Sequence, residues 1–254
     1  MWWIFWLWLA VPRLPVGPAF YPPDDSILLQ NSGQVQLRWT RPGKKFVVRF
    51  WQGEVLQSQV TTTERSFPVS VESGGTYLWS VQSTAGGPVE NHAFSVAGSF
   101  AYHSDGRSGT ASDVRGLPGS NGGQLRVELV RDEHGMNLYI VERQASRRYL
   151  FCEPGLRFLI TARGGNGSDG AAGRDFSSHP QGYDGGAAGW GGNIRVLTRN
   201  APWRDYLDLD VTPGQAGRGG RGGFYQDGDD IVQAPDGAAG RPGQGGRVDT
   251  RLEP

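Results

Sequence analysis

The sequence has very little cysteine, no net charge and no long apolar segment. Cys152 is the only cysteine among 254 residues, so no disulfide can form within the chain. It follows Leu150 and Phe151 and is interpreted as a small buried hydrophobe rather than a reactive thiol. The 25 basic and 25 acidic residues balance and are scattered, so no field gathers phosphate groups. Nucleic acid is therefore not expected as a partner.

The apolar segment at the N-terminus is too short to span a bilayer. It covers residues 1–11 and stops at Pro12, whereas a spanning helix needs about 20 apolar residues. This length is typical of a signal-peptide core, and Gly17 and Ala19 supply small residues where a signal peptidase cuts. Residues 1–19 are therefore predicted to be the signal peptide of an exported chain. No Lys or Arg precedes the apolar run, so an uncleaved, membrane-held N-terminus is the alternative.

Residues 20–100 are predicted to form an antiparallel β-sandwich. Short β-rich runs alternate apolar and polar residues, and turn residues such as Gly53 and the pair Gly74-Gly75 separate them. This spacing is typical of a small sandwich of seven strands. The runs are Ser26 to Leu29, Val35 to Trp39, Lys45 to Trp51, Val55 to Val60, Phe67 to Val71, Tyr77 to Val81 and Phe94 to Val96.

Three motifs follow one another in this segment. They are Gly33-x-Val35-x-Leu37-x-Trp39, then Gly75-Thr76-Tyr77-x-Trp79-x-Val81, then Phe94-x-Val96. Their order resembles the bacterial branch of the fibronectin type III superfamily. The resemblance implies that Trp39 fills the core between two sheets and that Tyr77 forms a tyrosine corner. Since residues two apart share a strand face, Trp79 is then expected to point inward as well. The resemblance implies a fold and no particular activity.

Most of the 40 glycines lie in residues 101–254, in bursts of period three. The unbroken pattern and dense proline of collagen are absent. Three residues per turn is the polyproline II period, in which a glycine column lets neighbouring backbones approach and hydrogen-bond. The sequence predicts a glycine-rich β domain with packed polyglycine II segments, and flexible linkers are the alternative. The clearest column is Gly214, Gly217, Gly220 and Gly223.

Ordinary strands separate these bursts and indicate two approximate repeats, at about 116–173 and 185–223. Each repeat consists of a glycine burst, a strand, an excursion, a second strand and another burst. The glycine-rich tail after Val232 has little apolar side-chain area. We therefore expect the tail to fray unless a partner packs against it.

No enzyme motif occurs in a suitable context. Gly165-x-Gly167-x-x-Gly170 matches a dinucleotide fingerprint, but the residues after it do not form a helix pattern. Asp208 and Asp210 lie on one strand face, where a polar surface is the simpler interpretation than a pair of glycosidase acids. The histidines lack metal-ligand spacing. No metal or other cofactor is expected, and the calcium candidates are Asp169, Asp227, Asp229 and Asp230.

The sequence therefore predicts an exported, non-enzymatic structural or adhesive protein of the cell envelope or surface. Edge strands and glycine bundles offer backbone hydrogen bonds to identical neighbours, so a self-assembling scaffold or filament subunit is favoured. The expected partners are other surface proteins and further copies of the chain. One alternative is a carbohydrate-binding module that uses Trp51, Trp190 and Trp203, and the other is a secreted hydrolase.

Overall fold

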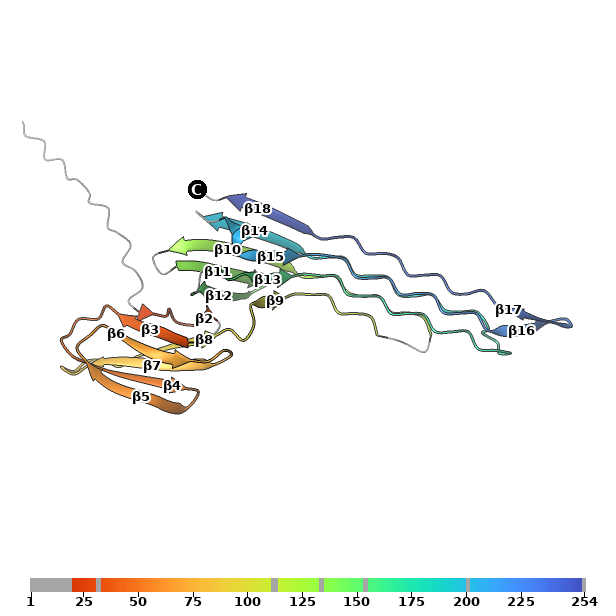
Figure 1. Cartoon of the computed structure of the whole chain (residues 1–254). Coiled ribbons are helices and arrows are strands. Elements are labelled where there is room, and N and C mark those ends of the chain that lie inside the picture. Colours follow the sequence, from red (N-terminus) through yellow and green to blue (C-terminus); the bar gives the residue numbers. More distant parts are fainter. Residues whose placement is uncertain are drawn as a thin grey trace, which may run out of the picture. The chain divides into compact units, whose positions relative to one another are not determined.

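The chain is all-β, as predicted. In the described part of the computed structural model, strands form several sheets, the one helix is a short 3-10 turn, and no α-helix occurs. The strands belong to two compact units. The predicted signal peptide lies outside the described residues. Figure 1 shows the chain, of which the structure describes residues 20–30, 33–110, 114–132, 135–152, 155–199 and 202–252.

The two units are not separated by a single cut in the sequence. Unit 1 contains residues 20–25, 33–71 and 75–94, and unit 2 contains 26–30, 72–74 and the chain from 95. The strand β2 (Ser26–Leu29), which the sequence analysis assigns to the sandwich, belongs to unit 2 and pairs in parallel with β12 (Ala145–Phe151). Its apolar pattern specifies a buried strand but not the partner, because either strand edge can form hydrogen bonds.

Unit 1 buries its aromatic residues between two sheets. Trp39, Tyr77 and Trp79, which the sequence analysis places in the core, are all buried, together with Phe46 and Phe94. Tyr77 stacks on Phe94 with ring centroids 5.3 Å apart. The first sheet has the order β1 (Phe20–Tyr21), β3 (Gly33–Trp39), β6 (Ser66–Val71). The strands on the other side of the core follow the order β8 (Glu90–Val96), β7 (Thr76–Ser83), β4 (Phe46–Gln52), β5 (Val55–Thr62).

Unit 2 is built on two sheets that share one apolar core. Leu129, Leu138, Phe158, Ile160 and Val196 are fully buried in that core. A 3-10 helix, η1 (Trp203–Asp205), precedes the last strand of the smaller sheet. The larger sheet has the order β18 (Arg247–Leu252), β14 (Asn193–Arg199), β10 (Gln124–Asp132), β11 (Gly135–Glu142), β12, β2, and the smaller has β15 (Leu207–Asp210), β13 (Phe158–Thr161), β9 (Ala101–His103).

Six extended glycine-rich segments continue from these strands, and we call them rods. Their backbones hydrogen-bond to one another at intervals of three residues rather than two. The hairpin β16 (Phe224–Asp227) and β17 (Asp230–Gln233) joins rods 5 and 6. Rod 1 covers residues 104–110, rod 2 114–123, rod 3 162–174, rod 4 180–192, rod 5 211–223 and rod 6 234–246.

The rods form two layers of opposite direction. Rods 1, 3 and 5 lead out from β9, β13 and β15, and rods 2, 4 and 6 lead back to β10, β14 and β18 (Figure 1). Within a layer the hydrogen bonds run between parallel rods, as in Gly167 to Gln215 and Gly170 to Arg218. Between layers they run between antiparallel rods, as in Gly186 to Ser168. Among the described residues, a unit of a strand, two rods and a returning strand occurs three times. This unit differs from the one predicted at about 116–173 and 185–223, which begins and ends with a glycine burst.

The expectation that the chain frays after Val232 is wrong for the described residues. Rod 6 donates backbone hydrogen bonds to rod 5, and β18 pairs in parallel with β14 over six residue pairs from Asn193 and Arg247 onward. Glycine rods are held by backbone hydrogen bonds, so a segment with little apolar area is still ordered by its neighbours within the chain.

Candidate functional site

The central column of rod 5 shows why its period-three positions are glycine. The amide of Gly217 donates to the carbonyl oxygen of Gly186 in rod 4 at 2.9 Å. A Cβ on Gly217 would overlap the carbonyl group of Ser168 in rod 3. A Cβ on Gly220 would overlap the carbonyl group of Ala171 in the same rod. These neighbours are backbone atoms and cannot swing aside. The glycine column of rod 5 therefore packs directly against the backbones of rod 3 and rod 4. The same holds for Gly214 and Gly223 at the two ends of the column.

Aspartate and asparagine side chains bond the amides that lie between the glycines. The Arg218 amide donates to Asp169 Oδ1 at 2.7 Å, and the Ala238 amide donates to Asp184 Oδ1 at 2.7 Å. Asn166 accepts a rod 5 amide in the same way. Each of these side chains joins two rods of one layer. The side-chain oxygens thus accept hydrogen bonds from backbone amides that have no carbonyl partner in the glycine-to-glycine pattern.

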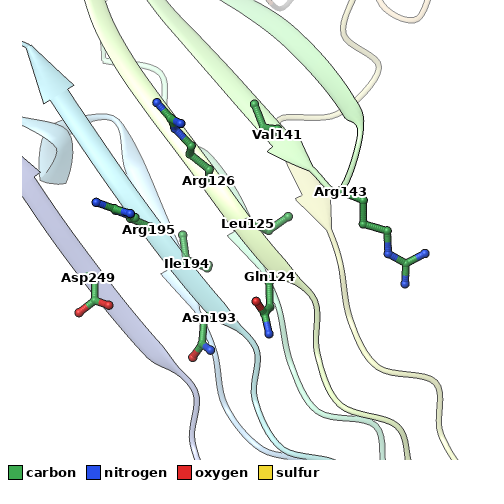
Figure 2. A pocket seen from close by; sticks show the side chains of 9 residues that line it. All are labelled: Gln124, Leu125, Arg126, Val141, Arg143, Asn193, Ile194, Arg195 and Asp249. Atoms are coloured by element: carbon green, nitrogen blue, oxygen red, sulfur yellow. The ribbon is translucent and has the colours of Figure 1, made fainter.

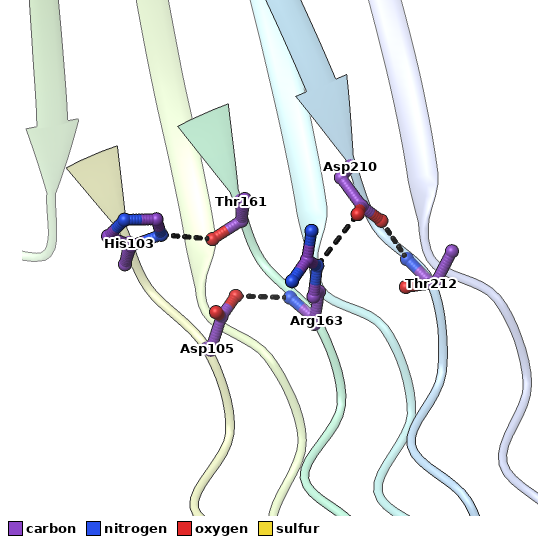
Figure 3. Close-up of polar contacts among 6 residues, drawn as sticks. All are labelled: His103, Asp105, Thr161, Arg163, Asp210 and Thr212. Carbon is purple, nitrogen blue, oxygen red and sulfur yellow. Dashed lines mark hydrogen bonds and ion pairs between the residues drawn. The ribbon is translucent and has the colours of Figure 1, made fainter. Parts of the chain in front are cut away.

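A row of polar contacts marks the point where β9, β13 and β15 become rods (Figure 3). His103 Nδ1 lies 2.8 Å from Thr161 Oγ1, and Asp105 Oδ1 accepts the Arg163 amide at 2.7 Å. Arg163 Nε donates to Asp210 Oδ2, also at 2.7 Å. The row links three parallel segments at the point where each strand ends and its rod begins. There the interval between backbone hydrogen bonds changes from two residues to three. We interpret it as a structural junction.

Asp208 and Asp210, the pair weighed as glycosidase acids, are both bound to arginine. Partial burial alone would raise the pKa of Asp210, but hydrogen bonds from Thr212 and Arg163 lower it below its ordinary value. The hydrogen bond from Arg157 lowers the pKa of Asp208. A glycosidase general acid needs a raised pKa. Neither carboxyl group is therefore suited to that role.

Glu142, at the end of β11, accepts hydrogen bonds from two residues near the point where β9 continues into rod 1. The Tyr102 hydroxyl donates to Glu142 Oε2 at 2.7 Å, and the Ser104 hydroxyl donates to the other carboxylate oxygen. Burial, followed by the hydrogen bond and the charge of Glu142, raises the pKa of Tyr102 to about 12. This contact ties β9 to β11, and it favours the neutral phenol.

The far end of rods 3 to 6 carries a cluster of exposed apolar side chains, which we call the apolar tip. Phe176 is 65% exposed and Ile231 is 67% exposed, while Phe224 and Val232 are each 38% exposed. The Phe176 amide donates to the Phe224 carbonyl oxygen at 2.7 Å, so the turn after rod 3 lies against the start of the β16–β17 hairpin. The tip combines residues from two places in the sequence.

The backbone of the apolar tip is held in an unusual conformation. Phe176 has a φ of 49°, in the left-handed region that few side chains other than glycine, asparagine and aspartate adopt. Residues in such conformations cluster at binding sites, where the surrounding structure enforces them. Here the Phe224 amide donates to Asp175 Oδ1 at 2.8 Å and fixes the adjacent residue. The result is a large aromatic ring presented to solvent.

The three tryptophans proposed as binding residues do not lie in one site. Trp51 lies in unit 1 and is half-buried, with Leu56 and Leu78 as its cross-strand neighbours. Trp190 is 53% exposed on rod 4. Trp203 packs against the core of unit 2, and the Arg204 guanidinium covers its ring at 5.1 Å. Of the three, only Trp190 is largely exposed, while Trp51 and Trp203 are half-buried and belong to different units.

The calcium candidates do not come together as a cation site. Asp169 accepts a rod amide, while Asp227 and Asp230 face each other across the β16–β17 hairpin, whose turn contains Asp229. No cluster of three or more His, Cys, Asp or Glu side chains suited to a metal ion occurs among the described residues. The hairpin residues remain an exposed acidic turn at the end of rod 5.

The apolar tip could not be predicted from the sequence, because exposure is a property of the fold. The hairpin itself had a local signal, since Asp227-Gly228 lies between two apolar pairs, and Asp-Gly between hydrophobic residues is a strong sign of a hairpin. Nothing in the sequence indicated that these pairs would lie outside the core.

Comparisons with known proteins identify no relative. No family model matches the chain, and neither the curated proteins nor the solved structures contain a match. Across the part of the chain that the structure describes, no helix is long and apolar enough to cross a membrane.

Proposed function

We propose that this chain is a non-enzymatic structural or adhesive protein of the cell envelope or surface, in which the rods present the apolar tip to a partner. Unit 1 is a fibronectin type III-like sandwich in this proposal, and the rods are a polyglycine II bundle. The observation that carries the proposal is the exposure of Phe176 and Ile231 at the far end of a hydrogen-bonded array. Export through the N-terminal segment is part of the same proposal.

The rods are suited to act as a rigid arm. A polyproline II segment rises about 3.1 Å per residue, so the 13 residues of rod 3 extend about 40 Å. Its neighbours on both sides are fixed by backbone hydrogen bonds rather than by mobile side chains. An array of this kind holds the hairpin away from the sheets of unit 2. Long-range presentation of a small surface is what an adhesive protein requires.

The apolar tip is suited to bind because its hairpin has little support of its own. A two-stranded hairpin is at best marginally stable in water, and here the strand β17 is exposed along its whole length. Scattered single apolar residues need no explanation, but a cluster at the end of an arm indicates an interaction surface. Burying Phe176 and Ile231 against a partner would remove this exposed area from water.

The partner is proposed to be another surface protein, a second copy of the chain or a glycan. These outcomes are separated by three measurements on the purified protein: sedimentation velocity, binding to intact cells and binding to a glycan array. The test variant is Phe176→Ser with Ile231→Ser, and the control is Val55→Ser with Leu56→Ser, which changes two exposed apolar residues on β5. We expect the tip variant to lose binding and the control to keep it.

The proposal would be rejected if both double variants bound as well as the wild type in every assay that shows binding. It would also be rejected if the wild type neither self-associated nor bound a cell or a glycan. A separate result bears on the carbohydrate-binding alternative, which the exposed ring of Trp190 supports. Loss of glycan binding in Trp190→Ala, with the tip variant unaffected, would favour that alternative.

A further inference from the structure

A groove on the outer face of the larger sheet of unit 2 gathers arginines from three segments. It has a volume of about 330 Å³, within the range of small-ligand sites. Arg126 of β10 and Arg195 of β14 lie directly opposite each other in parallel register. Arg143 lines the groove from the turn between β11 and β12, and Asp249 of β18 lies opposite Arg195 on its other side (Figure 2).

The positive charges of this arrangement are only partly compensated within the sheet. Neighbouring strands lie about 4.8 Å apart, and like charges placed directly opposite destabilise a sheet. Arg126 is partly compensated by an ion pair with Glu128, and Asp249 is paired with Arg247. The described residues supply no ion pair or side-chain hydrogen bond to Arg195 or Arg143. Three arginines against one aspartate leave the groove lining with a net charge of about +2, counted at neutral pH.

Arg143 is held at the groove in a conformation that arginine rarely adopts. It is the first residue of a two-residue hairpin loop and has a φ of 55°. Such a position usually takes glycine, asparagine or aspartate. The two-residue turn itself requires this conformation, and non-glycine residues held in it are found at binding sites as well as in turns. The strain is an observation independent of the charge of the groove.

The groove also offers amide donors beside the guanidinium groups. Gln124 and Asn193 lie opposite each other, two residues before Arg126 and Arg195 on the same strands. They are therefore on the same face of the sheet and closer to the rods. The Arg247 backbone amide donates to Asn193 Oδ1 at 3.2 Å, which leaves the Nδ2 hydrogens of that side chain for a ligand. Guanidinium groups bind carboxylates in a bidentate manner, and amides bind hydroxyl groups. The pairing therefore fits a sugar that carries a carboxylate.

The hollow continues past the first groove. A second space of about 480 Å³ shares Gln124 and Arg143 with it and extends over Gly122 and Gly123 to Glu142. This second space adds the Glu142 carboxylate, whose oxygens accept hydrogen bonds from the Tyr102 and Ser104 hydroxyls. A surface of this length fits an extended chain better than a small free anion. No aromatic side chain lines either space, so bases have nothing on which to stack.

We propose that the arginine groove, formed by Gln124, Arg126, Arg143, Asn193 and Arg195, binds an acidic polysaccharide through its carboxylates. The site lies on the sheets of unit 2 and uses none of the residues of the apolar tip. It therefore goes beyond the proposed function, and each can fail without the other. Bound carboxylates would offset the repulsion between Arg126 and Arg195, and the amides would select sugar hydroxyls.

The test is isothermal titration calorimetry of the full chain with a short oligogalacturonate, and with a maltooligosaccharide as the neutral control. We expect binding of the acidic sugar only, with an affinity that falls as salt is added. Arg126→Gln with Arg195→Gln is expected to weaken binding at least tenfold, and Arg143→Gln several-fold. Arg241→Gln, on rod 6 and outside the groove, is expected to bind as the wild type does. Asp249→Asn is expected to tighten binding, because it removes the one acid in the groove.

The thermal midpoints of all variants are compared, so that loss of binding is separated from loss of folding. If the double variant unfolds, the Arg143→Gln and Asp249→Asn variants still give opposite signs. Unchanged binding in Arg143→Gln together with weaker binding in Asp249→Asn would overturn the proposal. Equal binding of the neutral and acidic sugars would overturn it as well. Inorganic phosphate that displaces the oligogalacturonate at equal concentration would show a simple anion site and would overturn the assignment to a polysaccharide.

Discussion

The amide of Gly217 donates to the carbonyl oxygen of Gly186 at 2.9 Å, while the α-carbon of Gly217 faces the carbonyl group of Ser168 in a third rod. One glycine thus contacts two neighbouring backbones at once. A side chain at this position would push rods 3 and 5 apart and would also disturb the hydrogen bond to rod 4. The effect of a single methyl group is therefore expected to spread over several hydrogen bonds.

Gly217→Ala with Gly220→Ala is expected to lower the thermal midpoint of unit 2 by about 10 °C or more, as a loss of several kcal/mol would in a domain of this size. Flexible linkers would respond in the opposite direction, because Gly→Ala narrows the unfolded ensemble by about 0.4–1 kcal/mol. Differential scanning calorimetry of the wild type and the variant measures the change.

Gly245→Ala is the matched control. Gly245 lies in rod 6, its φ is outside the left-handed region, and a Cβ there has nothing within 4 Å. We expect its midpoint to stay within about 1–2 °C of the wild type, as for most surface substitutions. A double variant that melts at or above the wild-type temperature would contradict the packing of the rods.

Local spacing was enough to predict the glycine columns and the burial pattern of unit 1. The period of three places Gly214 to Gly223 on one side of a rod, and the period of two places Tyr77 and Trp79 on one face of a strand. The third strand-and-rod unit was missed because rod 6 is stabilised by backbone hydrogen bonds, which leave no trace in apolar content. The sequence therefore indicated the type of packing better than its extent.

The candidate sites were less predictable because they depend on register between distant segments. Arg126 and Arg195 are far apart in the chain, and only the parallel pairing of β10 with β14 places them opposite each other. Likewise, the turn that contains Phe176 meets the strand β16 through the backbone hydrogen bond from Phe176 to Phe224. Periodicity within a segment carries no information about such pairs.

Tyr102→Phe tests the contact between β9 and β11. Burial and the hydrogen bond to Glu142 raise the Tyr102 pKa to about 12, above the value of about 10 in an unfolded chain. The neutral phenol is thus favoured by folding, and this stabilisation is complete below pH 10 and is lost as the pH rises toward 12. At neutral pH we expect the variant to be less stable by about 1 kcal/mol. That deficit should shrink above pH 10.

The measurement combines urea unfolding with the absorbance of tyrosinate in the native state. The difference between the wild-type and Tyr102→Phe titrations isolates the one phenol. A difference curve centred near pH 10 would contradict the interaction with Glu142. So would a stability deficit that stays constant from neutral to alkaline pH.

Asp210→Asn tests the junction between β15 and rod 5. Partial burial alone would raise the Asp210 pKa, but the hydrogen bonds from Thr212 and Arg163 outweigh it and lower the pKa. A lowered folded pKa gives stability that is present above the unfolded value of about 4 and is lost as the pH falls through the folded value. We expect the variant to lose up to about 1 kcal/mol at neutral pH, and to approach the wild type in acid.

Urea unfolding at several pH values between about 7 and 3 follows this convergence. Asp229→Asn, in the exposed hairpin turn, is the control for the change in formal charge. A difference between the Asp210→Asn protein and the wild type that widens in acid would contradict the assigned direction.

Asp169 distinguishes a bond between rods from a calcium site. Its Oδ1 accepts the Arg218 amide at 2.7 Å, and an asparagine oxygen can accept the same hydrogen bond. Asp169→Ala is therefore expected to destabilise unit 2 by about 1 kcal/mol, whereas Asp169→Asn should stay close to the wild type. If Asp169 were a calcium ligand, calcium would raise the midpoint of the wild type and both substitutions would reduce that rise. Thermal unfolding with added calcium and with a chelator tests this, and a calcium-dependent midpoint in the wild type alone would refute the structural role.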